Sequence, residues 1–267
     1  MPLSRLFKKI LSLHPLESDL ERAIRKKEFI FYYQPELDLT TGRVTGVEAL
    51  IRWVHPDKGL IAPMEFIPLL EKKGLMKKLT PFLFSQTMHD FALLNKSGFN
   101  KIFMSVNISP QQLKEKRLLS VIKKNLKKYG INPRKYECEI TETAVLDDLP
   151  KDLKVLDKID KLKLRLSIDD FGSGYASFDY LRNLKVGKMK IDRQFVACLF
   201  EHPNNKIILS AIIKLGHQLK LSVLAEGVET RQQALWLKKQ KCDLVQGFLY
   251  ARPMPILELV QFLKKHK

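Results

Sequence analysis

The sequence predicts an α/β protein, a modified (β/α)8 barrel of the TIM type with an antiparallel first strand. Short apolar segments that favour buried strands alternate with stretches whose apolar residues recur at helical spacing. The chain has 267 residues, close to the roughly 250 that a single barrel of this kind needs. The first two expected strands are joined by a turn too short for a helix, so they must be antiparallel.

Each expected strand is a short run of apolar and β-branched residues. The strands are expected at 29–37, 47–51, 102–106, 136–140, 164–168, 188–192, 221–225 and 244–245. The turn Thr40-Thr-Gly-Arg43 connects the first two as a hairpin. Helices are expected at 16–28, 64–74, 78–96, 110–128, 150–162, 193–219, 229–240 and 256–265.

Composition favours one domain in a reducing compartment. The three cysteines, Cys138, Cys198 and Cys242, are far apart and lack metal-ligand spacing, so we expect buried free thiols and a cytoplasmic protein. The formal charge of +18 would attract polyanions. However, the lysines are interleaved with apolar residues at helical spacing, which is typical of solvated helix faces, and we expect no dedicated nucleic-acid partner.

The N-terminal residues 1–15 form a basic amphipathic segment that precedes the domain expected at 16–267. Lys8 and Lys9 interrupt the apolar run that a signal peptide would need. The segment could pack on the barrel as a helix or a frayed arm. Alternatively, residues 3–13 could make weak contact with the inner face of a membrane, with apolar side chains in lipid and basic ones near anionic head groups.

Carboxylates and amides recur where the expected strands end. They are Glu48, Asn107, Glu139, Asp169, Asp170, Glu226 and Gln246. Because the carboxyl ends of parallel strands meet on one face of a barrel, we expect these side chains to gather there, where such barrels carry out chemistry. Glu48, Asn107, Glu139 and Asp169 offer oxygen ligands without histidine or thiolate, which favours Mg²⁺ or Mn²⁺ over zinc.

The motifs around these residues resemble, in order, the motif series of the EAL-domain cyclic-di-GMP phosphodiesterases. They are Tyr33-Gln-Pro35, Glu48-Ala-Leu-Ile-Arg52, Asn107-Ile-Ser109, Glu139-Ile-Thr-Glu142, Asp169-Asp-Phe-Gly-Ser-Gly174, Lys190-Ile-Asp192, Glu226-Gly-Val-Glu229 and Gln246-Gly247. The resemblance runs from about residue 16 to the C-terminus. It implies a bacterial signalling hydrolase, active as a homodimer, that cuts cyclic di-GMP to linear 5'-pGpG with two Mg²⁺ or Mn²⁺ ions per site.

The resemblance also implies a role for each motif residue. Glu48, Asn107, Glu139 and Asp169 would hold the first metal, and Asp169 would bridge to a second that Asp170 also binds. Glu226 would act through water as an outer ligand or proton acceptor, and Lys190 would direct its ammonium at the bridging water or a phosphate oxygen. Arg52 would clamp phosphate, while Gln34, Leu50 and Gln246 would complete the substrate floor. Glu142 would anchor the loop that begins at Asp170.

The sequence departs from the family pattern at Lys185-Val-Gly187, where proline and aspartate are more usual. The departure concerns the loop near the expected dimer face and no expected metal ligand. Two other functions stay open: a catalytically weak cyclic-di-GMP receptor that acts through a protein partner, and an interaction scaffold that kept only the fold. The desolvation cost of buried, uncompensated carboxylates disfavours the scaffold.

Overall fold

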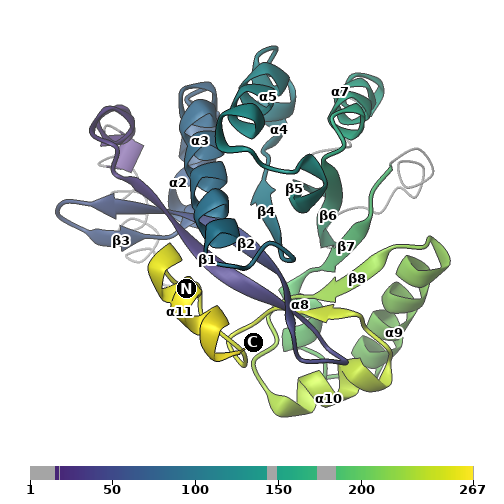
Figure 1. The fold of residues 1–267 in the computed structure, drawn as a ribbon. Coiled ribbons are helices and arrows are strands. Elements are labelled where there is room, and N and C mark those ends of the chain that lie inside the picture. Colours follow the sequence, from purple (N-terminus) through teal and green to yellow (C-terminus); the bar gives the residue numbers. More distant parts are fainter. Residues whose placement is uncertain (1–15, 18, 143–148, 173–184, 267) are drawn as a thin grey trace, which may run out of the picture.

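The computed structural model describes residues 16–17, 19–142, 149–172 and 185–266. In these ranges the strands of one sheet curl into a closed barrel with helices outside it (Figure 1). The strands are β1 (Phe29–Asp38), β2 (Val44–His55), β3 (Gly59–Ile61), β4 (Phe103–Asn107), β5 (Tyr136–Thr141), β6 (Arg165–Phe171), β7 (Lys188–Ile191), β8 (Ser222–Ala225) and β9 (Leu244–Val245). The helices, with one short 3-10 turn, are α2 (Pro63–Lys72), α3 (Met76–Lys96), α4 (Pro110–Leu113), α5 (Leu118–Tyr129), η1 (Pro133–Lys135), α7 (Leu149–Lys161), α8 (Arg193–Ala197), α9 (Pro203–Gln218), α10 (Arg231–Lys239) and α11 (Ile256–Lys265).

The strand order confirms the expected modified barrel. Around the ring it is β1-β9-β8-β7-β6-β5-β4-β2, and β1 pairs with β2 to close it. The first strand is antiparallel to both neighbours, β2 and β9, whereas the pairs from β2–β4 round to β8–β9 are parallel. The turn at residues 40–43 makes this arrangement necessary, because a connection of this length cannot return the chain for parallel pairing.

Three expectations about the extent of helices and strands were wrong. The helix expected at 110–128 is divided into α4 and α5, and no residue type marks the break. The helix expected at 193–219 is divided into α8 and α9, because Pro203 lacks the N–H that a continuing helix needs and instead begins α9. The second strand extends to His55 and turns back as β3, a short hairpin that we did not predict.

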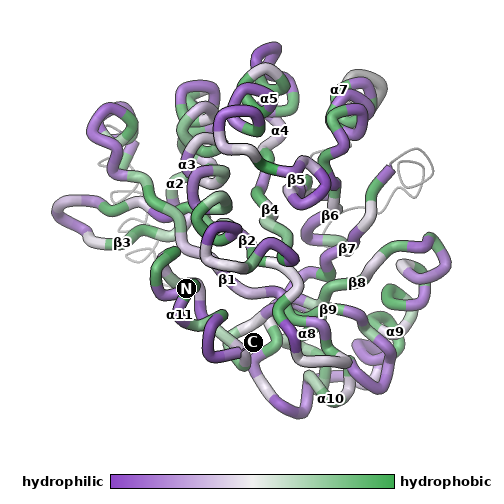
Figure 2. Tube along the Cα trace, in the orientation of Figure 1, coloured by the Kyte–Doolittle hydropathy of each residue, from purple (hydrophilic) through white to green (hydrophobic). Residues whose placement is uncertain are grey.

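The outer helices bury one face and expose the other. Figure 2 shows hydrophilic and hydrophobic residues alternating along helices such as α3, α5 and α9. On α5, Ile122 and Leu126 are buried, while the side chains of Lys123, Lys124 and Lys127 are exposed. This division explains how a chain with so many lysines can surround an apolar core.

Several expectations concern residues outside the described ranges. These include the alternative membrane contact of residues 3–13 and most of the loop that follows Gly172. Among the described residues, no helix is long and apolar enough to cross a membrane. The three cysteines are free thiols; Cys138 and Cys242 are buried and Cys198 is half-buried.

Candidate active site

The parallel strands bring the predicted acidic residues to one end of the barrel. Asn107 on β4 is in register with Glu139 on β5, and Thr141 on β5 is in register with Asp169 on β6. Lys190 lies near the end of β7, and Glu226 directly follows β8. The sequence pattern therefore predicted the correct face, since residues at equivalent heights on adjacent parallel strands must be neighbours.

Two acidic groups with the geometry of metal sites lie at this end. Glu48, Glu139 and Asp169 form one, and Asp169, Asp170 and Glu226 form the other; within each, one oxygen per residue lies within 4.8 Å of the others. Asp169 belongs to both groups. Oε1 of Glu139 is buried and has no hydrogen-bond partner among the described residues. An acceptor left in this way is a fitting ligand for a hard cation.

Asp169 and Asp170 both face the site although they are consecutive in a strand. Successive side chains normally point to opposite faces. Here the pairing register of β6 with β7 shifts between Ile168 and Phe171, and Asp170 has a positive φ of 53°. The backbone N–H of Asp170 donates to Oδ1 of Asp169 at 2.9 Å. The irregularity redirects the chain so that both carboxylates reach the same site.

Lys190 is the cation at the centre of these carboxylates. Its Nζ atom lies 2.7 Å from Glu226, 2.9 Å from Glu139, 3.3 Å from Glu48 and 3.5 Å from Asp169. Its side chain has no exposed surface. Burial lowers the pKa of Lys190, but the surrounding carboxylates outweigh it and hold that pKa well above its usual value. The ammonium is therefore charged at neutral pH.

The carboxylates cannot all ionise easily beside one another. Burial, together with neighbouring carboxylates, raises the pKa values of Glu139, Asp169 and Glu226 despite the opposing effect of Lys190. The pKa of Asp170 is raised to about 6 by burial and by the negative charges of Asp169 and Asp192. Such a concentration of perturbed carboxyl groups in a cleft is typical of active sites.

Glu48 is held by a chain of amides. Gln34 donates to the carbonyl oxygen of Ala251, Gln246 donates to Oε1 of Gln34 at 3.0 Å and to Oε2 of Glu48 at 2.7 Å, and Asn107 donates to Oε1 of Glu48 at 2.8 Å. Burial would raise the pKa of Glu48, but Lys190, Gln246 and Asn107 together keep that pKa below its usual value. Gln34 and Gln246, expected to contact substrate, thus also orient an expected metal ligand.

A cleft of about 510 Å³ opens over this end of the barrel. The expected substrate residues Gln34, Leu50, Arg52 and Gln246 all line it. Arg52 is half-buried, donates to the carbonyl oxygen of Ile51 at 2.9 Å and lies over the ring of Tyr32. A cation at the wall of an acidic cleft is suited to holding a phosphate close to a metal site.

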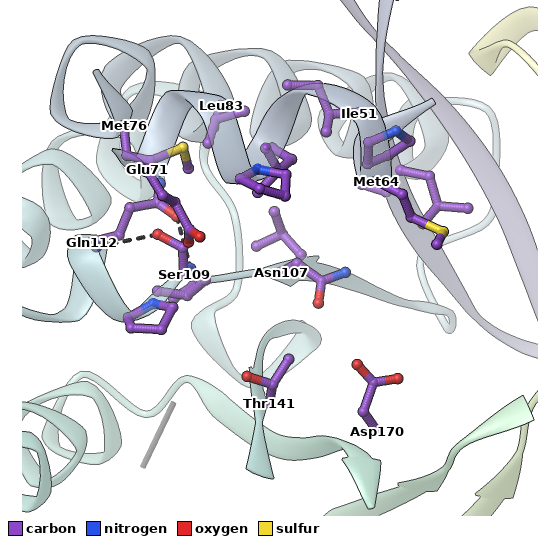
Figure 3. A pocket seen from close by; sticks show the side chains of 18 of the residues that line it. Ile51, Met64, Glu71, Met76, Leu83, Asn107, Ser109, Gln112, Thr141 and Asp170 are labelled. Carbon is purple, nitrogen blue, oxygen red and sulfur yellow. Dashed lines mark hydrogen bonds between the residues drawn. The ribbon is translucent and has the colours of Figure 1, made fainter. Parts of the chain in front are cut away.

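A second pocket of about 450 Å³ adjoins this cleft and is shown in Figure 3. Leu50, Met64 and Asp170 line both. Apolar side chains such as Ile51 and Leu83 form much of its wall (Figure 3). Asp170, which belongs to the acidic site, and Asn107, which donates to Glu48, also line it. Burial raises the pKa of Glu71 at its other side. Asn107 is therefore accessible from a pocket outside the main cleft.

Glu142 is connected to the start of the glycine-containing loop. It is buried, and its Oε2 atom accepts a hydrogen bond from the backbone N–H of Gly172 at 2.8 Å. The loop residues after Gly172 lie outside the described ranges. This contact is compatible with the anchoring role expected for Glu142, which remains a prediction.

Sequence reasoning missed two sets of residues. Asp192, Arg193 and Glu229 line the cleft, although no role was assigned to them. Below the site, Lys188 forms buried ion pairs with Glu36 at 2.7 Å and with Glu137 at 2.6 Å. The signal for this pair was available: Glu137 and Lys188 each precede an inward-facing residue, Glu139 and Lys190, by two positions, and strand side chains alternate with a period of two.

A barrel with acidic groups gathered at the carboxyl ends of its strands belongs to the class of TIM-type barrels that carry an active site on that face. A model of the EAL domain family matches residues 17–253. The signaling protein YkoW of Bacillus subtilis is 38% identical over 247 residues, 92% of this chain and 31% of YkoW. The cyclic di-GMP phosphodiesterase NbdA of Pseudomonas aeruginosa is 35% identical over 252 residues, 94% of this chain and 32% of NbdA.

Solved structures agree with this match. The PaMucR phosphodiesterase in complex with c-di-GMP superposes with a TM-score of 0.88 at 36% identity, covering 92% of this chain and 99% of that one. The EAL enzyme Bd1971 bound to cAMP and cyclic di-GMP gives a TM-score of 0.90 at 29% identity, covering 95% of this chain and 69% of that one. The chain belongs to the EAL domain family. It spans about a third of the length of the curated relatives named above.

Proposed function

We propose that this chain is a metal-dependent phosphodiesterase that hydrolyses cyclic di-GMP to linear 5'-pGpG and so lowers signalling by this second messenger. The observation that carries the proposal is the pair of acidic groups that share Asp169. Relatives whose names state cyclic di-GMP phosphodiesterase activity, at about 35% identity, support the choice of substrate. The cleft beside the acidic groups provides space for a dinucleotide.

We propose two Mg²⁺ or Mn²⁺ ions as the cofactors. Glu48, Asn107, Glu139 and Asp169 would hold the first, and Asp169 and Asp170 the second. When all are ionised, the five carboxylates of the two acidic groups and the ammonium of Lys190 leave four negative charges, which is the charge that two divalent cations neutralise. A pair of such ions supplies an activated water at neutral pH and stabilises the attacking and leaving oxygens.

The remaining residues would bind and orient the substrate. Arg52 would hold a phosphate through its planar fork, and Leu50 with Gln34 and Gln246 would form the floor beneath it. Glu226, whose pKa is raised by burial and by neighbouring carboxylates, would act as the proton acceptor. Lys190, 2.7 Å from Glu226, would hold its ammonium toward the attacking oxygen or a phosphate oxygen.

We propose 16–267 as the phosphodiesterase domain and a homodimer as its assembly. The support for the dimer is the resemblance of the motifs alone, and light scattering of the purified chain would test it. Contact of residues 3–13 with the inner face of a membrane stays a proposal, which sedimentation with anionic vesicles would test by comparing the chain with a variant that begins at residue 16.

The direct test is incubation with cyclic di-GMP and Mg²⁺ or Mn²⁺, followed by chromatography of the nucleotides. Formation of pGpG that stops in excess EDTA is the expected result. Binding without turnover would instead indicate a receptor that acts through a partner. Absence of both would leave only the fold in common with the family.

A further inference from the structure

We infer that Arg193 binds the phosphodiester of the substrate that is not cut; this inference rests on the proposed function. Cyclic di-GMP has two phosphodiester groups, and the cleft is strongly acidic. Of the described residues that line it, six are carboxylates and two are arginines, Arg52 and Arg193. The proposed metal ions would neutralise the carboxylates at their own site, but Asp192 and Glu229 also line the cleft, and a second arginine offsets their repulsion of a dianionic ligand.

The backbones of the two arginines lie on opposite sides of the barrel, and the guanidinium of Arg193 extends to Met64, which also lines the cleft. Arg52 is on β2, and Arg193 follows β7 by two residues. In the closed ring of β1, β9, β8, β7, β6, β5, β4 and β2, these strands are four positions apart in either direction. Glu139, Asp169 and Glu226 come from β5, β6 and the end of β8, strands that lie between β2 and β7 around the ring. A phosphate held over the acidic groups near Arg52 therefore leaves Arg193 to meet the other half of the molecule.

The backbone of Arg193 is fixed beside the catalytic face. Asp192 accepts a hydrogen bond from the backbone N–H of Gln194 at 2.6 Å and so starts α8 with Arg193 as its first residue. A side chain at Gly227 would place its Cβ atom 2.7 Å from Cβ of Arg193, which real contacts do not allow, and Gly227 has a positive φ of 67°. Glycine at this position therefore lets Arg193 lie against the residue that follows Glu226.

The guanidinium of Arg193 has N–H donors beyond the one that contacts Met64. The side chain is exposed, and Nη2 lies 3.9 Å from the sulfur of Met64, a weak acceptor. Arg193 forms no ion pair with any described carboxylate, although six line the same cleft. Exchanging the sulfur for two phosphate oxygens would replace a weak contact with a charge-assisted, two-pronged one. Arg52 differs, since it is half-buried and already bonded to the backbone.

The test is the affinity for cyclic di-GMP of the full chain and of Arg193→Ala and Arg193→Lys, titrated with Ca²⁺ present to suppress turnover. Arg231→Ala is the matched control, because Arg231 is also an exposed arginine at the first position of a helix but does not line the cleft. We expect Arg193→Ala to weaken binding about tenfold, since charge-assisted bonds of this kind are worth that much or more. Arg193→Lys should fall in between, because lysine keeps the charge and loses the fork.

A second probe distinguishes phosphate from base. The 7-deazaguanine analogue of cyclic di-GMP keeps both phosphates and lacks the N7 acceptors that arginine reads in guanine. An equal loss for both ligands in Arg193→Ala supports the phosphate contact, and KM should rise more than kcat falls. The inference is overturned if the loss disappears with the analogue, if Arg231→Ala weakens binding equally, or if Arg193→Ala binds like the parent while the parent still cleaves cyclic di-GMP. A parent that neither binds nor cleaves it refutes the proposed function instead.

Discussion

Nζ of Lys190 lies 2.7 Å from Oε1 of Glu226, in the interior of a site where both side chains are surrounded by other carboxylates. Each group shifts the pKa of the other. Burial raises the pKa of Glu226 and Lys190 opposes that effect, while the carboxylates as a group keep Lys190 charged. The pair therefore combines a carboxyl group whose pKa is raised with a fixed positive charge beside it.

The substitution Glu226→Gln should separate catalysis from binding. Glutamine keeps the shape and most hydrogen bonds but removes the proton acceptor, and general-base help of this kind is worth roughly 10² to 10⁴ in rate. Affinity for cyclic di-GMP should change far less, because the proposed contacts come mainly from Arg52, Gln34 and the first metal. Equal losses in titrated affinity and in turnover would make Glu226 a binding residue.

The identity of the metal should follow from the all-oxygen ligand set. Mg²⁺ and Mn²⁺ should both support hydrolysis, whereas Ca²⁺, which is larger and accepts looser coordination, should occupy the site and support little reaction. Initial rates with each ion, measured after dialysis against chelator, test this. Undiminished hydrolysis in excess EDTA would contradict the proposal.

Gln246→Leu should weaken metal binding, because the donor that orients Glu48 at 2.7 Å is lost. Loss of a group that positions a metal ligand typically costs about 10- to 100-fold in metal affinity. Titration with Mn²⁺ in the absence of nucleotide measures this directly. Gln218→Leu, at an exposed position on α9, is the control, and equal affinities for both variants would mean that Gln246 contacts only substrate.

Lys188→Met should destabilise the barrel without touching the cleft. The substitution leaves Glu36 and Glu137 buried without their shared cation, and breaking a buried pair in this way costs about 3–5 kcal/mol. Urea unfolding followed by circular dichroism measures the loss. Lys214→Met, at an exposed position on α9, should leave the free energy of unfolding nearly unchanged.

Lys188→Met should also change how the stability of the barrel responds to acid. In the parent, burial would raise the pKa of Glu137, but Lys188 and Arg165 lower it below its usual value. This carboxylate therefore contributes stability above its ordinary pKa and loses it as the pH falls further. Without Lys188, we expect burial to raise the pKa of Glu137, so that this carboxylate takes up a proton as the pH falls. The difference in free energy of unfolding between the parent and Lys188→Met should therefore become smaller as the pH falls from 8 to 5. A constant difference across this range would contradict the assignment.

Most of the fold and the position of the site could be predicted from the sequence. Alternation of strand and helix patterns implied the barrel, and the short turn at residues 40–43 implied the antiparallel first strand. The acidic residues were recognised because each ends an apolar run. What the residues alone could not give was the side-chain network that joins Gln34, Gln246 and Glu48, since it depends on bringing together positions that are 198 and 212 residues apart.

Two features were not predicted from the sequence, for different physical reasons. The segment between α4 and α5 contains no proline or glycine, and the helical spacing of apolar residues continues across it, so the sequence predicts one helix. Arg193 follows the recognised Lys190-Ile-Asp192 motif, yet an arginine that starts a helix is ordinarily a solvated residue. The folded structure shows that Arg193 lines the same cleft as Arg52.

The most direct test of the central claim is the conversion of cyclic di-GMP to pGpG by the parent, Glu48→Ala and Asp169→Ala side by side, at equal concentration with Mg²⁺. Circular dichroism and thermal melting would establish that all three chains are folded. We expect pGpG from the parent and none above background from either variant, because each loses an oxygen ligand from the shared acidic groups. Full activity in a folded, metal-replete Glu48→Ala or Asp169→Ala chain would contradict the account.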